Sequence, residues 1–514
     1  MHFSKTLALA SAGVVLVTSP NAAAAQAKAG KQPSVFIQCD GRVGHVSAGE
    51  TFGRLLLLTA TAGLSEAAMA GDKADGRVSG AAGAAACDAA LQSEGDGYRR
   101  AQLGLAKAIH LGEAAQWDSA AAAARAVPSL IAAQAGDWSL TRSTETAAAG
   151  IEAWALARAG KMAEAETVQA RAVVRAGADA LALQRTASYL RLTRTMSEPK
   201  RKAYFHLMRF APQFQTVALY GFADAGDYRS ARTAIRATYG LHKAMYAKAP
   251  PQSQFEAMEA SYAAMDGNAA DARRLLDAAR ASFARDRSEG NFNGPENASS
   301  VDEDLAFAEA ATAMAEGKMA DARRLIGQRS LWGGIAPGMV TDLVTKLRAD
   351  APAGDRPGIL AGDPAASWSD FTNARIKMMG EEAETKRLWK SLTELMVDKH
   401  YAPLAKQAAT GAGPKPKWLM KPIKDIPLKF ELVSVTGAFY GPAINEPMML
   451  HAAYIARARG KQGIALAPSR KSLEMVGVKF VNPGDEGIAA ESIIDANALI
   501  AELEPHLKPA ETAR

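Results

Sequence analysis

The sequence predicts a mainly α-helical protein in which helical hairpins stack against one another and a small C-terminal α+β domain follows them. Alanine makes up much of the 48% hydrophobic content, and only 6% of the 514 residues are aromatic. Because alanine favours helices and fills little volume, closely packed helices fit this composition better than a sheet sandwich. A helical hairpin at 253–283 recurs in degenerate form along the chain, and from residue 428 the apolar residues alternate as in strands.

Residues 1–25 have the pattern of a secretion signal. Lys5 gives a positive start, residues 7–17 are apolar, and 23–25 supply a small-residue cleavage pattern. The apolar stretch is shorter than the ~20 residues that a membrane-spanning helix needs. We therefore expect a cleaved signal peptide and a mature protein in the periplasm or outside the cell, with an uncleaved N-terminal anchor as the alternative.

Residues 26–83 are expected to hold a strand at 34–38, a helix at 51–69 and a glycine-rich loop. Cys39 and Cys87 are the two cysteines of the sequence. An even pair in an exported protein suggests one disulfide, which would tie the strand to the first helices. The alternative is two free, buried thiols.

Helical periodicity continues with short interruptions over 84–349. In the hairpin at 253–283, Ser253 and Glu256 have the spacing of a capping box, and 266–268 breaks the first helix. The second helix carries an apolar stripe of Ala272, Leu275, Leu276 and Ala279. Neither helix can bury its stripe alone, so the hairpin needs neighbours of the same kind.

A local signature marks the turn of each hairpin: a small residue, a side chain of varied size two positions later, and an alanine five positions later. The five copies are Ala115-Trp117-Ala120, Gly160-Met162-Ala165, Gly226-Tyr228-Ala231, Gly267-Ala269-Ala272 and Gly317-Met319-Ala322. The small residue ends the first helix, and the alanine lets the second helix pack closely against it. The long gap after the second copy predicts a further hairpin at 181–195 and 200–210.

Turns with this spacing resemble those of the tetratricopeptide repeat family, and Ala153, Ala260 and Ala310 match the family's small first-helix residue. The copies are separated by 45, 66, 41 and 50 residues, whereas the family repeat is ~34 residues. The resemblance implies a degenerate α-solenoid over 84–349 with a concave face lined by the first helix of each hairpin. The alternative is an irregular all-α domain.

In the family's register, a candidate groove on this face would hold a set of aromatic, amide and polar side chains. They are Trp154, Gln213, Tyr220, Gln254, Ser261, Asp304 and Phe307. We therefore expect a non-enzymatic protein-protein interaction scaffold that binds a peptide or protein partner, with Tyr220 and Phe307 partly reachable from solvent. The alternative for each side chain is packing of helix against helix.

After the hairpins, composition predicts a linker at 350–370, a helical segment at 371–412 and a basic, proline-rich linker at 413–427. The basic linker carries Lys415, Lys417 and Lys421 around Trp418. We expect a solvated spacer there, with peripheral contact to anionic lipid head groups as the alternative.

Residues 428–508 are expected to form the α+β domain in the order strand, helix, strand, strand, helix. The strands are predicted at 429–435, 463–467 and 474–481, and the helices at 447–458 and 493–503. This order, with Val433, Val435 and 437–439, superficially resembles the sporulation-related glycan-binding domain of cell-wall proteins. The resemblance implies an alternative function, binding of peptidoglycan or another envelope glycan through this domain.

Motifs for catalysis are missing from the sequence: it contains no GxSxG, HExxH, phosphate-binding loop or dinucleotide fingerprint. Two cysteines are too few for a metal cluster of sulfur ligands, and the histidines, His400 and His451 among them, are scattered. The net charge of +6 is small for 514 residues and does not indicate nucleic acid as a partner. We expect no cofactor, no metal and no catalytic residue; an enzyme assembled from distant segments is the third candidate.

Overall fold

The computed structural model describes the chain in several stretches. They are 33–42, 76–131, 138–178, 189–245, 252–290, 295–349, 351–352, 356–390, 431–434, 441–468 and 475–507, with the single positions 183, 292, 354 and 392. The predicted signal peptide, the helix at 51–69 and the basic linker at 413–427 lie outside these residues, as do His400 and the side chains of Gln213 and His451. Within the described stretches, no helix has the length and apolar character to cross a membrane.

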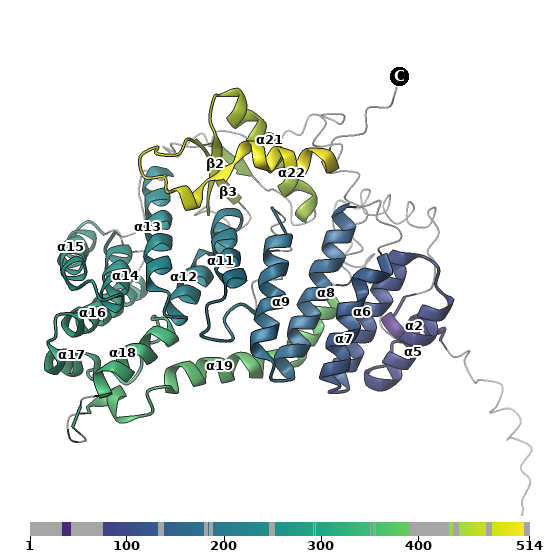
Figure 1. Ribbon diagram of the computed structural model, residues 1–514, viewed down its shortest axis with the longest axis horizontal. Helices are drawn as coiled ribbons and strands as arrows, with labels where there is room; N and C mark the ends of the chain where they lie inside the picture. The colour runs from purple at the N-terminus through teal and green to yellow at the C-terminus, as the bar shows by residue number, and fades with distance from the viewer. Residues whose placement is uncertain are drawn as a thin grey trace, which may run out of the picture.

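The described chain is mainly helical, with a small antiparallel sheet near its C-terminus. Helices follow one another in a row from α5 at one end to α17 at the other (Figure 1). In chain order they are α5 (Gly80–Ser93), α6 (Gly97–Glu113), α7 (Trp117–Ile131), α8 (Trp138–Arg158), α9 (Met162–Arg175), α11 (Glu198–Phe210), η4 (Pro212–Phe214), α12 (Gln215–Asp224), α13 (Tyr228–Met245), α14 (Gln252–Met265), α15 (Ala269–Ser288), α16 (Pro295–Ala315) and α17 (Met319–Ile326). The helices α6, α8, α12, α14 and α16, each of which precedes a signature turn, are called the first helices below.

The five signature turns share one backbone geometry. The small residue of each is left-handed, with φ of 57° at Ala115, 81° at Gly160, 73° at Gly226, 83° at Gly267 and 78° at Gly317. At Gly267 its N–H donates to the carbonyl of Ala264 (3.0 Å), and the next N–H, of Asn268, donates to Ala263 (2.9 Å). This is the Schellman pattern of a helix end. The predicted helix ends are confirmed, and the signature alanines at 120, 165, 231, 272 and 322 are completely buried.

Ala115 is the one signature position without glycine, and it is the one non-glycine residue with positive φ in the described chain. A side chain in this conformation costs about 1–2 kcal/mol, partly offset because glycine loses about 0.5–1 kcal/mol more entropy on folding. We expect Ala115→Gly to raise the free energy of unfolding by about 0.5–1 kcal/mol in urea titrations. The control Ala122→Gly, on the exposed face of α7, should lower it by about 1 kcal/mol.

Ala272 lies where α14 and α15 pack together, in a core that also contains Tyr262 and Leu276. Because the alanine is completely buried, Ala272→Leu has no space for the added atoms and should lower the free energy of unfolding by about 1–3 kcal/mol. Ala270→Leu, on the exposed side of α15, should stay within about 0.5 kcal/mol of wild type. A neutral Ala272→Leu in chemical denaturation would show that the close approach of these two helices is wrong.

The predicted strand at 34–38 is wrong, because this stretch forms the short helix α2 (Val35–Asp40). The Ser34 hydroxyl accepts a hydrogen bond from the Ile37 N–H (3.4 Å), and Gly41 ends the helix with φ of 79°. A short apolar run does not distinguish strand from helix. Here the serine cap, the glycine stop and packing against α5 and α6 decide for helix.

After α17 the chain turns back along the row. Residues 331–392, called the return segment below, include α18 (Pro337–Ala349), η5 (Gly358–Ala361) and α19 (Ala366–Met379), and 382–390 are again helical. Figure 1 shows α19 running from α18 across the row toward α9 and α8. The stretch predicted as a linker at 350–370 thus contains η5 and the first residues of α19.

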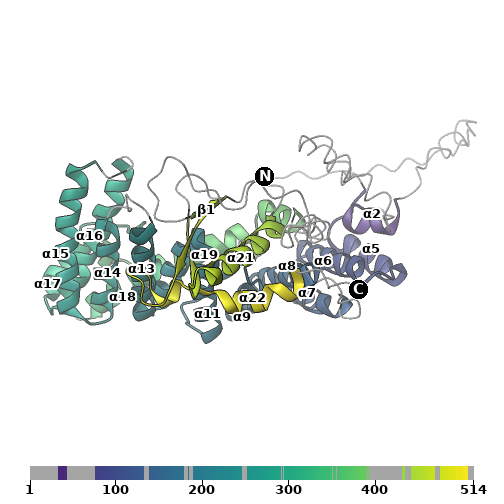
Figure 2. The ribbon, with the colours of Figure 1, turned by 90° about the horizontal axis from the view of Figure 1, so that it is seen from above.

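The C-terminal part has the predicted order, with one short strand added. Its elements are β1 (Glu431–Ser434), α21 (Gly441–Ala458), β2 (Gly463–Pro468), β3 (Met475–Val481), η6 (Ala490–Ser492), β4 (Ile494–Asp495) and α22 (Ala496–Leu507). The strands pair antiparallel in the order β1-β3-β2-β4. Figure 2 shows α21 and α22 over the middle of the row, between α14–α17 at one end and α5–α7 at the other.

Both faces of the β2–β3 pair are covered. Ile464 and Leu466 pack with α21 and α22, whereas Ala465 and Val481 pack with Leu241 of α13. The row also approaches this domain closely at Gly240, where an added Cβ would lie 2.5 Å from the carbonyl oxygen of Gly487. The row of helices therefore supplies the second layer on this sheet.

Candidate functional site

The first helices hold six of the seven predicted groove residues, whereas Gln213 lies in η4, and packing within the chain covers most of the six. Trp154, Ser261, Asp304 and Phe307 are buried, and Tyr220 and Gln254 are half-buried. The expectation that Phe307 is partly reachable from solvent is wrong: its exposed fraction is 0%. An open groove at the buried positions is likewise wrong. The return segment covers Trp154 and Phe307, whereas Asp304 is buried where α16 packs against α14.

The return segment lies against the first helices in reverse order. The Phe307 ring of α16 packs edge to face with Trp332, with centroids 5.6 Å apart. The Tyr220 hydroxyl of α12 donates to the Gly334 carbonyl (2.8 Å), and the Trp154 indole N–H of α8 donates to the Met379 carbonyl (3.0 Å). At the far end, residue 389 meets α6. The face predicted to bind a partner is therefore occupied by the chain itself.

Residues 189–195, called the groove loop below, lie between α12 and the return segment. The Arg191 guanidinium pairs with the Asp224 carboxylate (2.6 Å) and lies 4.6 Å from the Phe371 ring centroid of α19. Tyr189 donates to Glu384 of the return segment, and Arg387 donates to the Tyr189 hydroxyl (3.1 Å). Arginine and tyrosine side chains thus form the polar part of the site.

A buried ion pair holds the groove loop in place. The Glu166 carboxylate accepts hydrogen bonds from the N–H groups of Leu192 (2.7 Å) and Thr193 (3.0 Å). The Lys200 ammonium donates to Glu166 (2.8 Å) and to the Thr193 carbonyl (2.8 Å). Burial lowers the pKa of Lys200, an effect that Glu166 opposes. Glu166 and Lys200 are 34 residues apart, so no short sequence spacing predicts this pair.

Asp304 is buried between α14 and α16, and its carboxyl accepts a hydrogen bond from the Gln254 amide (3.4 Å). Burial raises the pKa of Asp304 to about 8; the Gln254 hydrogen bond opposes this rise and the Glu303 carboxylate adds to it. The folded state therefore favours the neutral acid at neutral pH. A neutral carboxyl next to an amide is suited to joining two helices.

The raised pKa of Asp304 makes stability depend on pH. Between the pKa of Asp304 in the unfolded state and its pKa of about 8 in the folded state, the folded state binds more protons than the unfolded state. The stability that comes from this proton is therefore present at low pH and is lost as pH rises through about 8. We expect the free energy of unfolding to fall by about 2 kcal/mol more in wild type than in Asp304→Asn from about pH 6 to about pH 8. Urea titrations across this range measure the difference, and Asp302→Asn, an exposed neighbour, is the control. Parallel profiles for wild type and Asp304→Asn would contradict the assignment.

The helix that occupies the groove, α19, buries few of its side chains. Of the 14 residues of α19 only Met379 is buried, whereas α14, with the same length, buries eight. Met378 is 60% exposed, and Phe371 and Ile376 are half-buried. The middle of the return segment therefore lies shallowly on the first helices.

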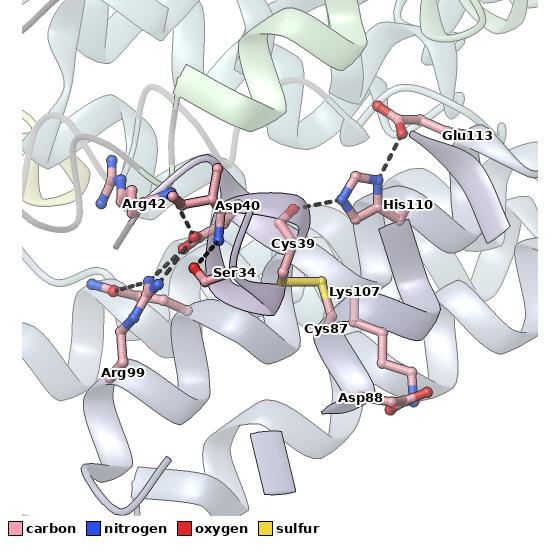
Figure 3. Close-up of a disulfide and its surroundings, with 12 residues drawn as sticks. Ser34, Cys39, Asp40, Arg42, Cys87, Asp88, Arg99, Lys107, His110 and Glu113 are labelled. Carbon is pink, nitrogen blue, oxygen red and sulfur yellow. Dashed lines mark hydrogen bonds and ion pairs between the residues drawn. A yellow bond between two sulfur atoms is a disulfide. The ribbon is translucent and has the colours of Figure 1, made fainter. Parts of the chain in front are cut away.

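The N-terminal end of the row carries the predicted disulfide, and its presence is confirmed: Cys39 of α2 is bonded to Cys87 of α5. Figure 3 shows this bond beside His110 and Glu113 of α6. Arg99 of α6 also pairs with Asp40, so both a covalent and an ionic link fix α2 to the row.

In the part of the chain that the structure describes, no group of three or more His, Cys, Asp or Glu side chains is placed to hold a metal ion. Comparison with known proteins gives no match to a protein-family model, a curated protein or a solved structure. The resemblances to tetratricopeptide repeats and to the glycan-binding domain stay predictions.

Proposed function

We propose that this chain is an exported, non-enzymatic scaffold of tetratricopeptide-like hairpins that binds a helical segment of a protein partner in the place of its own α19. The observation that carries the proposal is the way the groove holds its present occupant. Trp154 and Arg158 of α8 donate to the main-chain carbonyls of Met379 (3.0 Å) and Ile376 (3.3 Å). Such contacts depend little on the sequence of the bound segment, so a partner helix can make them too.

The energetics support an exchange of one helix for another. An isolated helix of 14 residues is marginal in water, so α19 depends on the groove for its structure. α19 buries one side chain, its carbonyls accept two hydrogen bonds from α8, each worth about 1 kcal/mol net, and Phe371 contacts Arg191. It is therefore held less firmly than a helix of the same length such as α14, which buries eight residues. A partner helix that buries two or three more side chains gains about 1.5–3 kcal/mol for each of them and displaces α19.

The test uses a labelled peptide with the sequence of residues 364–390 and the full-length protein, with binding followed by fluorescence anisotropy. Phe371→Ala weakens the attachment of α19, so the groove should be vacant more often and the peptide should bind about tenfold more tightly than to wild type. Asn373→Ala, on the exposed side of α19, should leave the affinity unchanged. Adding Trp154→Phe to Phe371→Ala removes one donor and should weaken binding. No measurable binding to Phe371→Ala would overturn the proposal.

Binding of an envelope glycan through the C-terminal domain is less favoured. Both faces of β2–β3 are covered, one of them by α13. The buried ion pair between Arg142 of α8 and Glu446 of α21 also fixes this domain on the row. These contacts support a role for the domain as part of the scaffold, and purified peptidoglycan should not pull down the protein. Residues 413–427, for which lipid contact was the alternative to a solvated spacer, and the expected export signal lie outside the described residues.

A further inference from the structure

Residues 33–42, called the N-terminal cap below, are joined to the end of the return segment by a continuous chain of contacts. The Cys39 carbonyl oxygen lies 2.7 Å from His110 Nε2, and His110 Nδ1 lies 2.9 Å from a Glu113 carboxylate oxygen (Figure 3). The other Glu113 oxygen accepts a hydrogen bond from the Trp389 indole N–H (2.9 Å). Residues far apart in the sequence therefore form one connected path from the disulfide to the return segment.

Trp389 is clamped from several sides. Its ring packs edge to face with His110 at 4.9 Å, and the Arg77 guanidinium lies 3.9 Å from the ring centroid. The same Glu113 carboxylate accepts a hydrogen bond from the Gly80 N–H (3.1 Å) at the start of α5. Burial raises the pKa of Glu113, but hydrogen bonds from His110, Trp389 and Gly80 outweigh it and lower that pKa to about 2. The acceptor in the middle of the path is therefore a charged carboxylate.

Trp389 fixes the chain just beyond α19, the weakly attached helix of the return segment. α19 buries only Met379, while Leu388, next to Trp389, is buried in the same core as Cys39 and Cys87. The cap is held by the disulfide and by the ion pair between Arg99 and Asp40: α2 has six residues, and Cys39 is the one that is buried. Without the disulfide, a helix of this length does not stay folded on its own.

We propose that the N-terminal cap is a redox-dependent latch that keeps α19 in the groove. When Cys39 and Cys87 are bonded, the Cys39 carbonyl holds His110, which with Glu113 holds Trp389. Reduction by a dithiol breaks the S–S bond, forms two S–H groups and converts the dithiol into a disulfide. Both sulfurs are buried, so this exchange proceeds through local opening of α2. The cap then leaves, Trp389 is released, and α19 detaches from the first helices.

The latch regulates the groove of the proposed function, but its test needs no partner. Hydrogen exchange of the full-length protein is followed in peptides from 366–390, from α2 and from α14–α15. Cys39→Ser/Cys87→Ser should speed exchange over 366–390 about tenfold, since the latch no longer restrains local opening. Glu113→Ala, which cuts the path but keeps the disulfide, should act in the same direction. The control Lys107→Ala removes the exposed ion pair between Lys107 of α6 and Asp88 of α5. Its exchange rates over 366–390 should match those of wild type.

Two results would overturn the latch: unchanged exchange over 366–390 in Glu113→Ala and in the cysteine variant, despite faster exchange in α2, or an equal increase in α14–α15. The first result would show that the cap does not restrain the return segment, and the second would indicate general destabilisation. If exchange follows the prediction but the reduced protein does not bind the 364–390 peptide more tightly than the oxidised protein, the latch stands and the proposed function fails.

Discussion

Lys200→Met is expected to lower the free energy of unfolding by about 3–5 kcal/mol, because it leaves a carboxylate buried without its cation. The side chains of Lys200 and Glu166 are 2% and 5% exposed, so water cannot replace the lost partner. Methionine has nearly the volume of lysine, and the change therefore removes charge and hydrogen bonds more than packing. Urea titrations at neutral pH give the magnitude.

The double variant Glu166→Gln/Lys200→Met separates the charge effect from the rest. Glutamine keeps an oxygen that accepts from the N–H groups of Leu192 and Thr193, but it carries no charge that needs a cation. The double variant should therefore be more stable than Lys200→Met alone, as expected when an unpaired buried charge is removed. If Lys200→Met stays within about 1 kcal/mol of wild type, Glu166 and Lys200 do not hold the groove loop together.

The hairpin turns could be predicted because their signal is local. Gly267 ends α14 in a left-handed conformation and Ala272 is small where α15 must approach, and both properties are visible within six residues of sequence. The order of strands and helices after residue 428 could also be predicted from local patterns. The N-terminal stretch at 34–38 failed because its apolar run is too short to show a period, so the serine and glycine at its ends decide its structure.

Only part of the candidate site could be predicted from the sequence. The repeat register placed Trp154 and Phe307 on the first helices, where the structure has them, but it carries no information about what lies on that face. Their partners, Met379 and Trp332, belong to a segment whose middle, at 350–370, has the composition of a linker. The contacts of Glu166 with the groove loop are also distant in sequence. Such pairings are set by tertiary packing, which a single sequence does not encode in any short pattern.

Cys87→Ser is expected to destabilise the N-terminal end of the row by about 4 kcal/mol, the chain-entropy value for a closed loop of this size. The two cysteines are 48 residues apart in sequence. Because each hairpin contacts mainly its neighbours, the loss should be concentrated in α2, α5 and α6 and should fade along the row. Native-state hydrogen exchange against urea measures this free energy helix by helix.

The matched comparison for Cys87→Ser is Cys39→Ser, which cuts the same bond from the other side. The two single variants should lose the same free energy within about 0.5 kcal/mol, and the double variant should lose no more than either, because one bond is removed in every case. Non-reducing peptide mapping of wild type should show a single linked pair of peptides that contain Cys39 and Cys87. Two alkylatable thiols in the folded wild-type protein, or additive losses in the double variant, would show that the stability of this end comes from packing of α2 against α5 and α6 and not from the covalent bond.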